Sequence, residues 1–202
     1  MLYGTAIIFC CVVVKECIAL NATFCGKYSC PSFTIDFEKE GYDRRFYTSA
    51  VWVGTSSSGG YDQATNANYK KLKDYLNGNN VDNKKIPMGI PVVTMMFPIG
   101  GLKVLDNFTT FFFIQPSSTP APAPNDRSVF IREVEPKHMY ICEAPSNIST
   151  VAEWVTEANN LSRAINETVI NEPSNAPKYY SSFFFTAHYN GPHRNDQYKE
   201  LW

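Results

Sequence analysis

The sequence predicts an α+β protein in which the order strands, helix, strands occurs twice along the chain. Residues 32–55 and 128–144 alternate apolar and polar side chains and are rich in Phe, Tyr, Val and Thr, as β-strands are. Each stretch is followed by apolar residues at helical spacing and then by a further strand region. Sequence identity between the two halves is faint, so we infer the duplication from the order of the elements.

Size and charge narrow the class of protein. The chain has 202 residues, 44% of them hydrophobic and 14% aromatic, which is enough for one sizeable core in a single domain. The formal net charge is −1 at pH 7, so no strong field attracts nucleic acid or an anionic membrane surface. We therefore exclude nucleic acid as a partner.

The first half contains two expected strands and a helix. The sequence GYD at 41–43 divides residues 32–55 into two antiparallel strands, and a flexible loop is expected over 56–60. Residues 61–76 then follow a helical period, and Asn77-Gly78 would end this helix as a C-cap. The residues expected on its buried face are Ala64, Asn68, Leu72, Tyr75 and Leu76.

A proline-interrupted apolar run comes next. Residues 84–98 read KKIPMGIPVVTMMFP, and proline is tolerated in a sheet only at an edge, a strand start or a bulge. The strand is therefore expected to break at Pro87 and Pro91. Residues 102–114 predict a strand pair or one long bent strand, and the proline-rich residues 115–127 predict a loop.

The second half repeats the order of the first. Residues 128–144 predict a strand pair, TVAEWVTEANNLSRAI a helix, and KYYSSFFFTAHYNGP a last strand segment. The apolar stripe expected on the second helix consists of Val151, Trp154, Val155, Ala158, Ser162 and Ile165.

The N-terminus predicts export. Residues 2–14 are apolar but too short to span a bilayer, and Cys17 and Ala19 are small residues at the −3 and −1 positions of a cleavage site. We expect residues 1–19 to be a secretory signal and the mature chain to be extracellular, without a membrane span. An uncleaved N-terminal anchor is the alternative. Five N-glycosylation sequons support export, at Asn21, Asn107, Asn147, Asn160 and Asn166.

The cysteines agree with an oxidising compartment. Cleavage would remove three of the six and leave Cys25, Cys30 and Cys142. Cys25 and Cys30 are close enough to close a small loop ahead of the first strand, so we expect this disulfide within an N-terminal segment, residues 20–30. Cys142 could instead pair with either of them. No CxxC pair or histidine-rich cluster suggests zinc.

The sequence does not predict an enzyme. It contains no nucleophile elbow, no paired-histidine metal motif and no phosphate-binding glycine loop, and the glycine pairs at 59–60 and 100–101 fit turns. We assign no catalytic residues. Three carboxylates that alternate on strands fit a solvated strand face, namely Asp43, Glu133 and Glu135.

Six segments together resemble a known family, the SOUL heme-binding proteins, also called the heme-binding protein 1/2 family. In order they are GYDRRFYTSAVWV, YDQAT opening the first helix, LKDYLNGNN, KKIPMGIPVV, the proline loop running into VFI, and FTAHYNGP. Their order and spacing carry the resemblance, which runs from about Pro31 to Trp202. Residues 31–202 would thus be a single SOUL domain.

The resemblance implies a distorted antiparallel β-barrel flanked by two helices and built as a pseudo-twofold duplication. The break at Pro87 and Pro91 would then be a corner through which the chain enters the sheet. Gly89 and Ile90 stand where family members usually carry Thr and Ala or Val, which should change packing more than architecture. The implied function is reversible capture of heme or a related porphyrin, which is not required for folding.

The resemblance also places the tetrapyrrole, in a shallow apolar cleft between the outward face of the first helix and a turn near the C-terminal end. A flat apolar surface, cations for two propionates and an optional iron ligand are what such a site needs. Tyr69 offers aromatic area and a candidate oxygen ligand. The implied site consists of Asn66, Tyr69, Lys70, Lys73, His193 and Arg194.

The positions of the histidines decide which of them is a candidate iron ligand. Some family members use an axial histidine from the early strand region, but residues 31–60 contain none, which excludes that route. His193, beside Arg194, is the best axial candidate. We expect His138 at a hairpin turn and His188 packed at the end of the sheet.

Two other functions compete with heme capture. Asn66 and Lys73 make the cleft more polar, which suits an amphipathic small molecule and hence an effector-binding module. An extracellular interaction protein is the third reading, although the sequons at Asn160 and Asn166 would crowd the second helix with glycans. A monomer is expected in each case.

Overall fold

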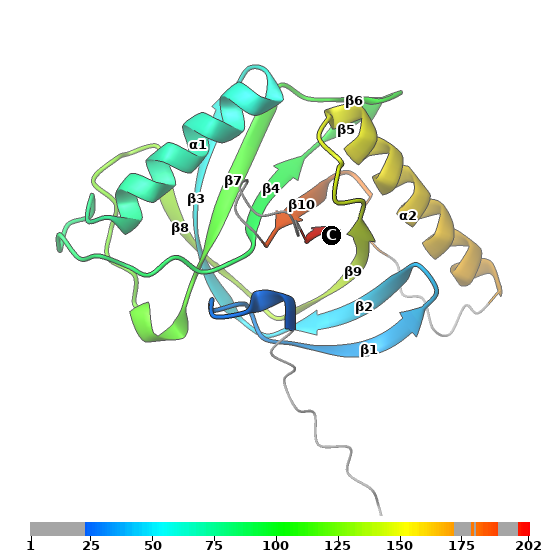
Figure 1. Ribbon diagram of the computed structural model, residues 1–202, viewed down its shortest axis with the longest axis horizontal. Coiled ribbons are helices and arrows are strands. Elements are labelled where there is room, and N and C mark those ends of the chain that lie inside the picture. The colour runs from blue at the N-terminus through cyan, green and yellow to red at the C-terminus, as the bar shows by residue number, and fades with distance from the viewer. Residues whose placement is uncertain (1–22, 172–178, 180, 190–197) are drawn as a thin grey trace, which may run out of the picture.

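The chain folds around one strongly curled antiparallel sheet with two helices packed on it (Figure 1). The computed structural model describes residues 23–171, 179, 181–189 and 198–202. Helix α1 spans Tyr61–Leu76 and helix α2 spans Val151–Asn171. The nine strands of the sheet are β1 (Phe33–Lys39), β2 (Tyr42–Tyr47), β3 (Ala50–Ser58), β4 (Val92–Met96), β7 (Asn107–Ile114), β8 (Val129–Val134), β9 (Lys137–Ala144), β10 (Phe184–His188) and β11 (Lys199–Leu201).

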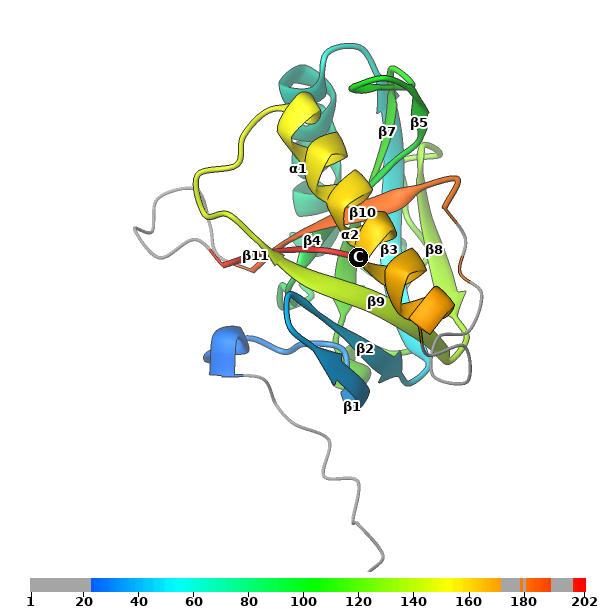
Figure 2. The ribbon, with the colours of Figure 1, turned by 90° about the vertical axis from the view of Figure 1, so that its right-hand side faces the viewer.

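The strand order shows the duplication. It runs β1-β2-β9-β11-β10-β4-β7-β3-β8, so β9-α2-β10-β11 and β3-α1-β4-β7 occupy matching places on either side of the β10–β4 pair. Helices α1 and α2 lie toward opposite ends of the sheet, as the two views show (Figures 1 and 2). The expected α+β fold with a pseudo-twofold duplication is therefore confirmed.

A long two-stranded ribbon, formed by β2–β3 and β8–β9, closes the curled sheet into a barrel. Strands β2 and β3 follow one another and pair with β9 and β8 in a single continuous register, from Asp43 opposite Ile141 to Thr55 opposite Val129. The ribbon bends at residues 48–49 and 135–136, between these strands. Because β9 also pairs with β11 and β3 with β7, the ribbon joins the two ends of the sheet into a distorted barrel.

The strand prediction differs from the structure in several places, and the bend of this ribbon explains the first. Residues 32–55 contain three strands and not two, since the chain crosses from one side of the barrel to the other at 48–49. The expected loop at 56–60 is mostly strand, because β3 runs on to Ser58 beside β7. Residues 102–114 contain two strands, β6 (Lys103–Val104) and β7, which is one of the two expected alternatives, but β6 pairs with β5 (Pro98–Gly100) in a separate hairpin and not with β7.

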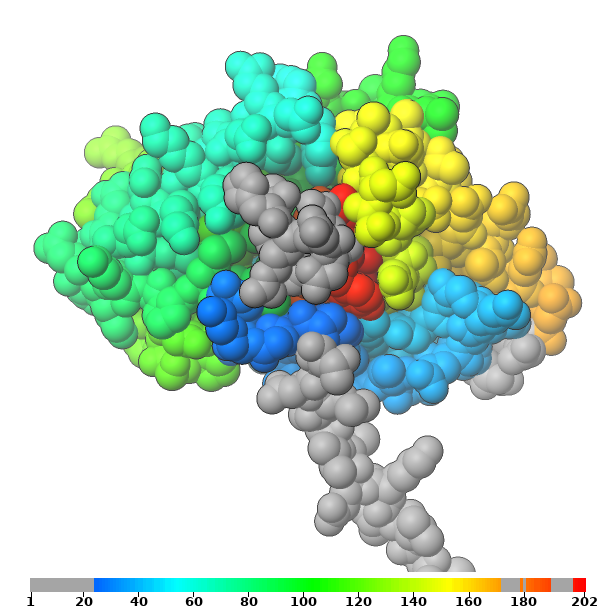
Figure 3. All heavy atoms as spheres, in the orientation of Figure 1, coloured from blue at the N-terminus to red at the C-terminus, as the bar shows by residue number. Residues whose placement is uncertain are grey.

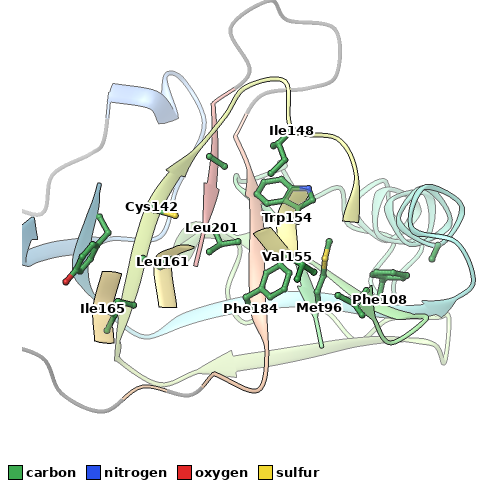
Figure 4. Close-up of a cluster of buried hydrophobic side chains, with 14 residues drawn as sticks. Met96, Phe108, Cys142, Ile148, Trp154, Val155, Leu161, Ile165, Phe184 and Leu201 are labelled. Carbon is green, nitrogen blue, oxygen red and sulfur yellow. The ribbon is translucent and has the colours of Figure 1, made fainter. Parts of the chain in front are cut away.

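The helices bury the faces that their spacing indicates. The buried residues of α1 match the predicted face in full, and the helix ends at Leu76 with Asn77 as its C-cap, followed by Gly78 with φ of 112°. On α2, Leu161 is buried where Ser162 was expected, and the Ser162 hydroxyl lies 2.6 Å from the Tyr179 hydroxyl. Trp154 has no exposed surface and belongs to the same core cluster as Ile148 and Val155 (Figure 4).

The proline-interrupted run is a corner, as expected. Residues 81–89 leave α1 without regular structure, and β4 begins at Val92, directly after Pro91. An N-terminal segment, residues 24–30, packs against this corner, and the Ile90 amide donates a hydrogen bond of 3.0 Å to the Ser29 carbonyl oxygen. Figure 3 shows this segment, in dark blue, against the lighter blue surface of β1 and β2.

The cysteines pair as expected. A disulfide joins Cys25 to Cys30 and closes the N-terminal segment, whereas Cys142 is a buried free thiol. Burial raises the pKa of the Cys142 thiol to about 12, so this thiol is not reactive at neutral pH.

Gly89 is required by close packing at the corner. A Cβ atom at this position would lie 2.6 Å from the Phe113 carbonyl oxygen and 3.2 Å from the Ser29 carbonyl oxygen. We expect Gly89→Ala to lower the free energy of unfolding by about 1–3 kcal/mol, because backbone must shift to make room. Urea denaturation measures this. Gly60→Ala is the control, since its Cβ would meet nothing within 4 Å. An equal loss in both variants would contradict the prediction.

Candidate functional site

The outward face of α1 carries four of the predicted site residues. Asn66, Tyr69 and Lys70 are exposed and Lys73 is half-buried. Their spacing of three, four and seven residues places them on one side of the helix. The opposite side of α1 packs on β3 and β7, which fixes the orientation of this face.

Tyr69 is an aromatic side chain on the surface. The residue is 41% exposed, and its ring lies edge-on to the buried Phe112 ring, with 5.2 Å between the centroids. The Tyr69 hydroxyl lies 4.0 Å from the sulfur of Met88, which comes from the corner segment. Met88 packs on the core cluster of Leu72 and Phe112 and is partly exposed. The Tyr69 phenol and the Met88 thioether therefore lie side by side at the helix face that carries Lys70 and Lys73.

Met88 is the site residue that sequence reasoning missed. It lies 19 positions after Tyr69, and helical spacing says nothing about which loop residue packs beside a helix. Its position within the KKIPMGIP motif is the one feature of the sequence that could have pointed to it.

The other predicted site residues lie elsewhere. His193 and Arg194 belong to residues 190–197, outside the described residues, as does Asn21. His138 is the second residue of β9 and not part of a turn, and its Nε2 lies 2.8 Å from a carboxylate oxygen of Asp36. His188 ends β10 and packs with its ring centroid 5.7 Å from that of Trp154, as expected.

Groups around the His188 imidazole shift its pKa. Burial, and secondly the positive charge of Lys199 opposite on β11, together lower the pKa of His188 to about 4. His188 is thus a neutral packing residue at neutral pH and not a solvated ligand.

A buried polar cluster lies inside the sheet. The Glu200 carboxylate, on β11, has no exposed surface and lies 2.9 Å from Arg45 Nη1, on β2. Three further donors reach the same carboxylate: the Tyr189 hydroxyl at 2.7 Å, the Tyr198 hydroxyl at 2.9 Å and the Trp202 indole N–H at 2.8 Å. Every oxygen of Glu200 is thereby satisfied, which a buried carboxylate requires.

Arg45 is also buried, with 5% of its surface exposed. Its guanidinium lies over the Phe33 ring, 4.5 Å from the centroid, and pairs with Asp43 at 3.0 Å. Burial opposes the charge, but Glu200, Tyr47 and Asp43 raise the pKa of Arg45, so it stays protonated. Asp43 is therefore part of an ion pair and not of a solvated strand face, which corrects the prediction. Both oxygens of Glu200 accept hydrogen bonds, whereas Asp43 Oδ1 has the ion-pair contact with Arg45 and no hydrogen-bond partner. We assign this cluster to structure.

Within the described ranges, no three His, Cys, Asp or Glu side chains come together in a way that could hold a metal ion. The same part of the chain contains no helix with the length and apolar character needed to cross a membrane.

A curled, duplicated antiparallel sheet with two helices is the architecture of the SOUL and effector-binding proteins. The chain belongs to the SOUL heme-binding protein family, whose model matches residues 28–202.

Individual relatives agree with this assignment. Heme-binding protein 2 of Mus musculus is 30% identical over 101 residues, which are 49% of this chain and 49% of that one. The match therefore spans about half the length of this curated relative.

Two solved structures of hydrolases from Listeria innocua share the fold. One has a TM-score of 0.50 at 12% identity, covering 81% of this chain and 90% of the other. The second has a TM-score of 0.51 at 10% identity, covering 82% and 92%. Identities this low show the common fold and nothing about the activity.

Proposed function

We propose that this protein is a secreted binding protein that captures heme or a related tetrapyrrole reversibly on the outward face of α1. The observation that carries the proposal is the exposed Tyr69 side chain, packed on Phe112 beside Met88, with Lys70 and Lys73 on the same helix face. Membership of the SOUL heme-binding protein family supports it.

The residues present fit a heme. The Tyr69 ring and the Met88 side chain offer apolar area for the macrocycle, and both carry an atom that can ligate iron. Lys70 and Lys73 offer ammonium groups for the two propionates. Bound heme would supply the iron and the macrocycle, and the protein would supply the surface that holds them.

We propose that the protein acts by binding and not by catalysis. The most conspicuous buried carboxylate, Glu200, is fully occupied by four donors and is not available for proton transfer. Export is proposed on the signal-like residues 1–19, the sequons and the disulfide between Cys25 and Cys30.

Heme titration followed by absorbance tests the site. A saturable Soret shift is expected, and Tyr69→Ala should weaken binding about tenfold, because it removes a stacking surface worth about 1.4 kcal/mol. Ile170→Ala is a control, since Ile170 is 77% exposed and lies on α2, not on α1 or the corner that carries Met88. Equal weakening by both changes would place the site elsewhere.

A second variant separates iron ligation from surface contact. Met88→Leu keeps the volume and the apolar area but removes the sulfur. If the thioether ligates iron, this change should shift the Soret maximum of bound heme and leave the affinity for metal-free protoporphyrin unchanged. No saturable shift with any tetrapyrrole would contradict the proposed function and favour the amphipathic-ligand alternative.

A further inference from the structure

Exposed apolar side chains gather on the β5–β6 hairpin. Ile99 is 57% exposed, Leu102 51% and Leu105 47%, and all three lie on or beside this hairpin. The hairpin turns through Gly100 and Gly101, both with positive φ, and lies at the end of the sheet near α2 (Figure 2). Neighbouring exposed apolar side chains form the kind of surface that another group can cover.

A cavity of about 350 Å³ lies between this hairpin and the start of α2. Leu102, Ile148 and Ala152 form apolar parts of its wall, and Glu153, Thr156 and Glu157 contribute polar groups. A volume in the range of about 300–1,000 Å³ is typical of sites that hold a small organic group. The wall thus offers both apolar contact and hydrogen-bond partners.

Asn147 also lines this cavity and is exposed. It is the first residue of Asn147-Ile148-Ser149, an N-glycosylation sequon. The asparagines of three other sequons, Asn107, Asn160 and Asn166, are exposed too. Among the cavity-lining residues that the structure describes, Asn147 is the one sequon asparagine.

The backbone around Asn147 is held in place, since the Ile148 amide donates a hydrogen bond of 3.1 Å to the Pro145 carbonyl oxygen. Ile148 points into the core, and its carbonyl oxygen accepts a hydrogen bond of 2.7 Å from the buried Lys199 ammonium (Figure 4). The amides of Ser149 and Thr150 donate to the Glu153 carboxylate at 3.0 and 2.8 Å, which caps α2. The point of attachment at the rim of the cavity is therefore fixed by the fold.

We propose that Asn147 carries an N-linked glycan whose first N-acetylglucosamine covers this cavity and the exposed Leu102. The sugar has C–H groups and an acetyl methyl for the apolar wall, and hydroxyl and amide groups for Glu153, Thr156 and Glu157. The glycan would keep the hairpin side of the molecule soluble. This inference rests on the export proposed above and is independent of heme binding.

The glycan comes from a donor that the secretory pathway supplies. The Nδ2 nitrogen of Asn147 displaces the pyrophosphate group from C1 of the sugar in a lipid-linked oligosaccharide. The C1–Nδ2 bond forms, the C1–O bond of the donor breaks, and the nitrogen loses one proton.

Occupancy of Asn147 is tested on the full chain secreted from a eukaryotic cell line restricted to high-mannose glycans. Release with peptide N-glycosidase F in oxygen-18 water converts a glycosylated asparagine to labelled aspartate. Peptide mass spectrometry should find this label at Asn147. An unlabelled Asn147, whether or not other sequons are occupied, overturns the proposal.

Coverage of the cavity is tested with the dye ANS, whose fluorescence reports exposed apolar surface. Endoglycosidase H leaves one N-acetylglucosamine on the folded protein and should leave the fluorescence unchanged, whereas complete removal should raise it about twofold or more. Asn147→Gln should raise it as much, and Asn160→Gln, on the solvent side of α2, should not. Leu102→Ser should abolish the rise.

Two results of the dye experiment would overturn the coverage. One is an equal rise after both enzymes, which would exclude the first sugar as the cover. The other is no rise after complete removal. The enzyme treatments act on folded protein, so they remain informative even if Asn147→Gln is not secreted. Heme titration of unglycosylated chain tests the proposed function separately.

Discussion

Replacing Arg45 by alanine is expected to lower the free energy of unfolding by about 3–5 kcal/mol, because it leaves a buried carboxylate without its cation. Glu200 has no exposed surface and lies 2.9 Å from Arg45 Nη1. Tyr189, Tyr198 and Trp202 would still donate to it, but none of them carries a charge. Urea denaturation followed by tryptophan fluorescence measures the loss, and Trp202 reports directly on the cluster.

Arg132→Ala is the matched control for this experiment. Arg132 is an exposed arginine on β8, and its removal should change stability by no more than about 0.5 kcal/mol. Arg45→Lys should recover part of the loss, since it restores the charge but not the second ion pair with Asp43. A loss below about 1 kcal/mol for Arg45→Ala would mean that water or another cation replaces the guanidinium.

Acidification is expected to destabilise the protein through His188. Its pKa falls from the ordinary value of 6.5 to about 4 in the folded state. Between pH 4 and pH 6.5 the unfolded chain binds a proton on His188 that the folded chain does not bind. The stability that neutral His188 contributes is therefore fully present above pH 6.5 and is lost as the pH falls to about 4. The loss should amount to about 3 kcal/mol, because one pKa unit corresponds to about 1.4 kcal/mol. Urea midpoints measured across this pH range give the value.

His188→Phe should remove this part of the pH dependence. Phenylalanine cannot titrate, and its ring can occupy the place beside Trp154. His138→Gln is the comparison with an exposed histidine on β9: it removes the contact with Asp36, and it should reduce the fall less than His188→Phe does. If the fall persists unchanged in His188→Phe, carboxylates and not His188 carry it.

The sequence predicted those parts of the fold that depend on local patterns. The five buried residues of α1 recur at helical spacing, so the buried face followed from the sequence alone. The corner at Pro87 and Pro91 followed from the missing proline donors. The division between β2 and β3 did not, because the chain stays extended on both sides of Thr48 and Ser49 and only the pairing partner changes.

The candidate site was predictable in part for the same reason. Asn66, Tyr69, Lys70 and Lys73 share a helix face, which spacing and family resemblance both indicate. Met88 reaches that face through tertiary packing, and the pairing of Arg45 with Glu200 joins strands from opposite ends of the chain. Contacts of this kind are set by the register of the sheet, which local sequence does not encode.

The ribbon of β2–β3 and β8–β9 also suggests how such a chain could arise. Strand β2 leads directly into β3 yet pairs with β9 of the second half, and β8 leads into β9 yet pairs with β3 of the first. Two identical half-length chains that exchanged their leading strands would have the same connectivity. The present barrel therefore has the topology of a domain-swapped homodimer whose subunits have been fused into one polypeptide, and neither half could satisfy its own sheet edge if separated.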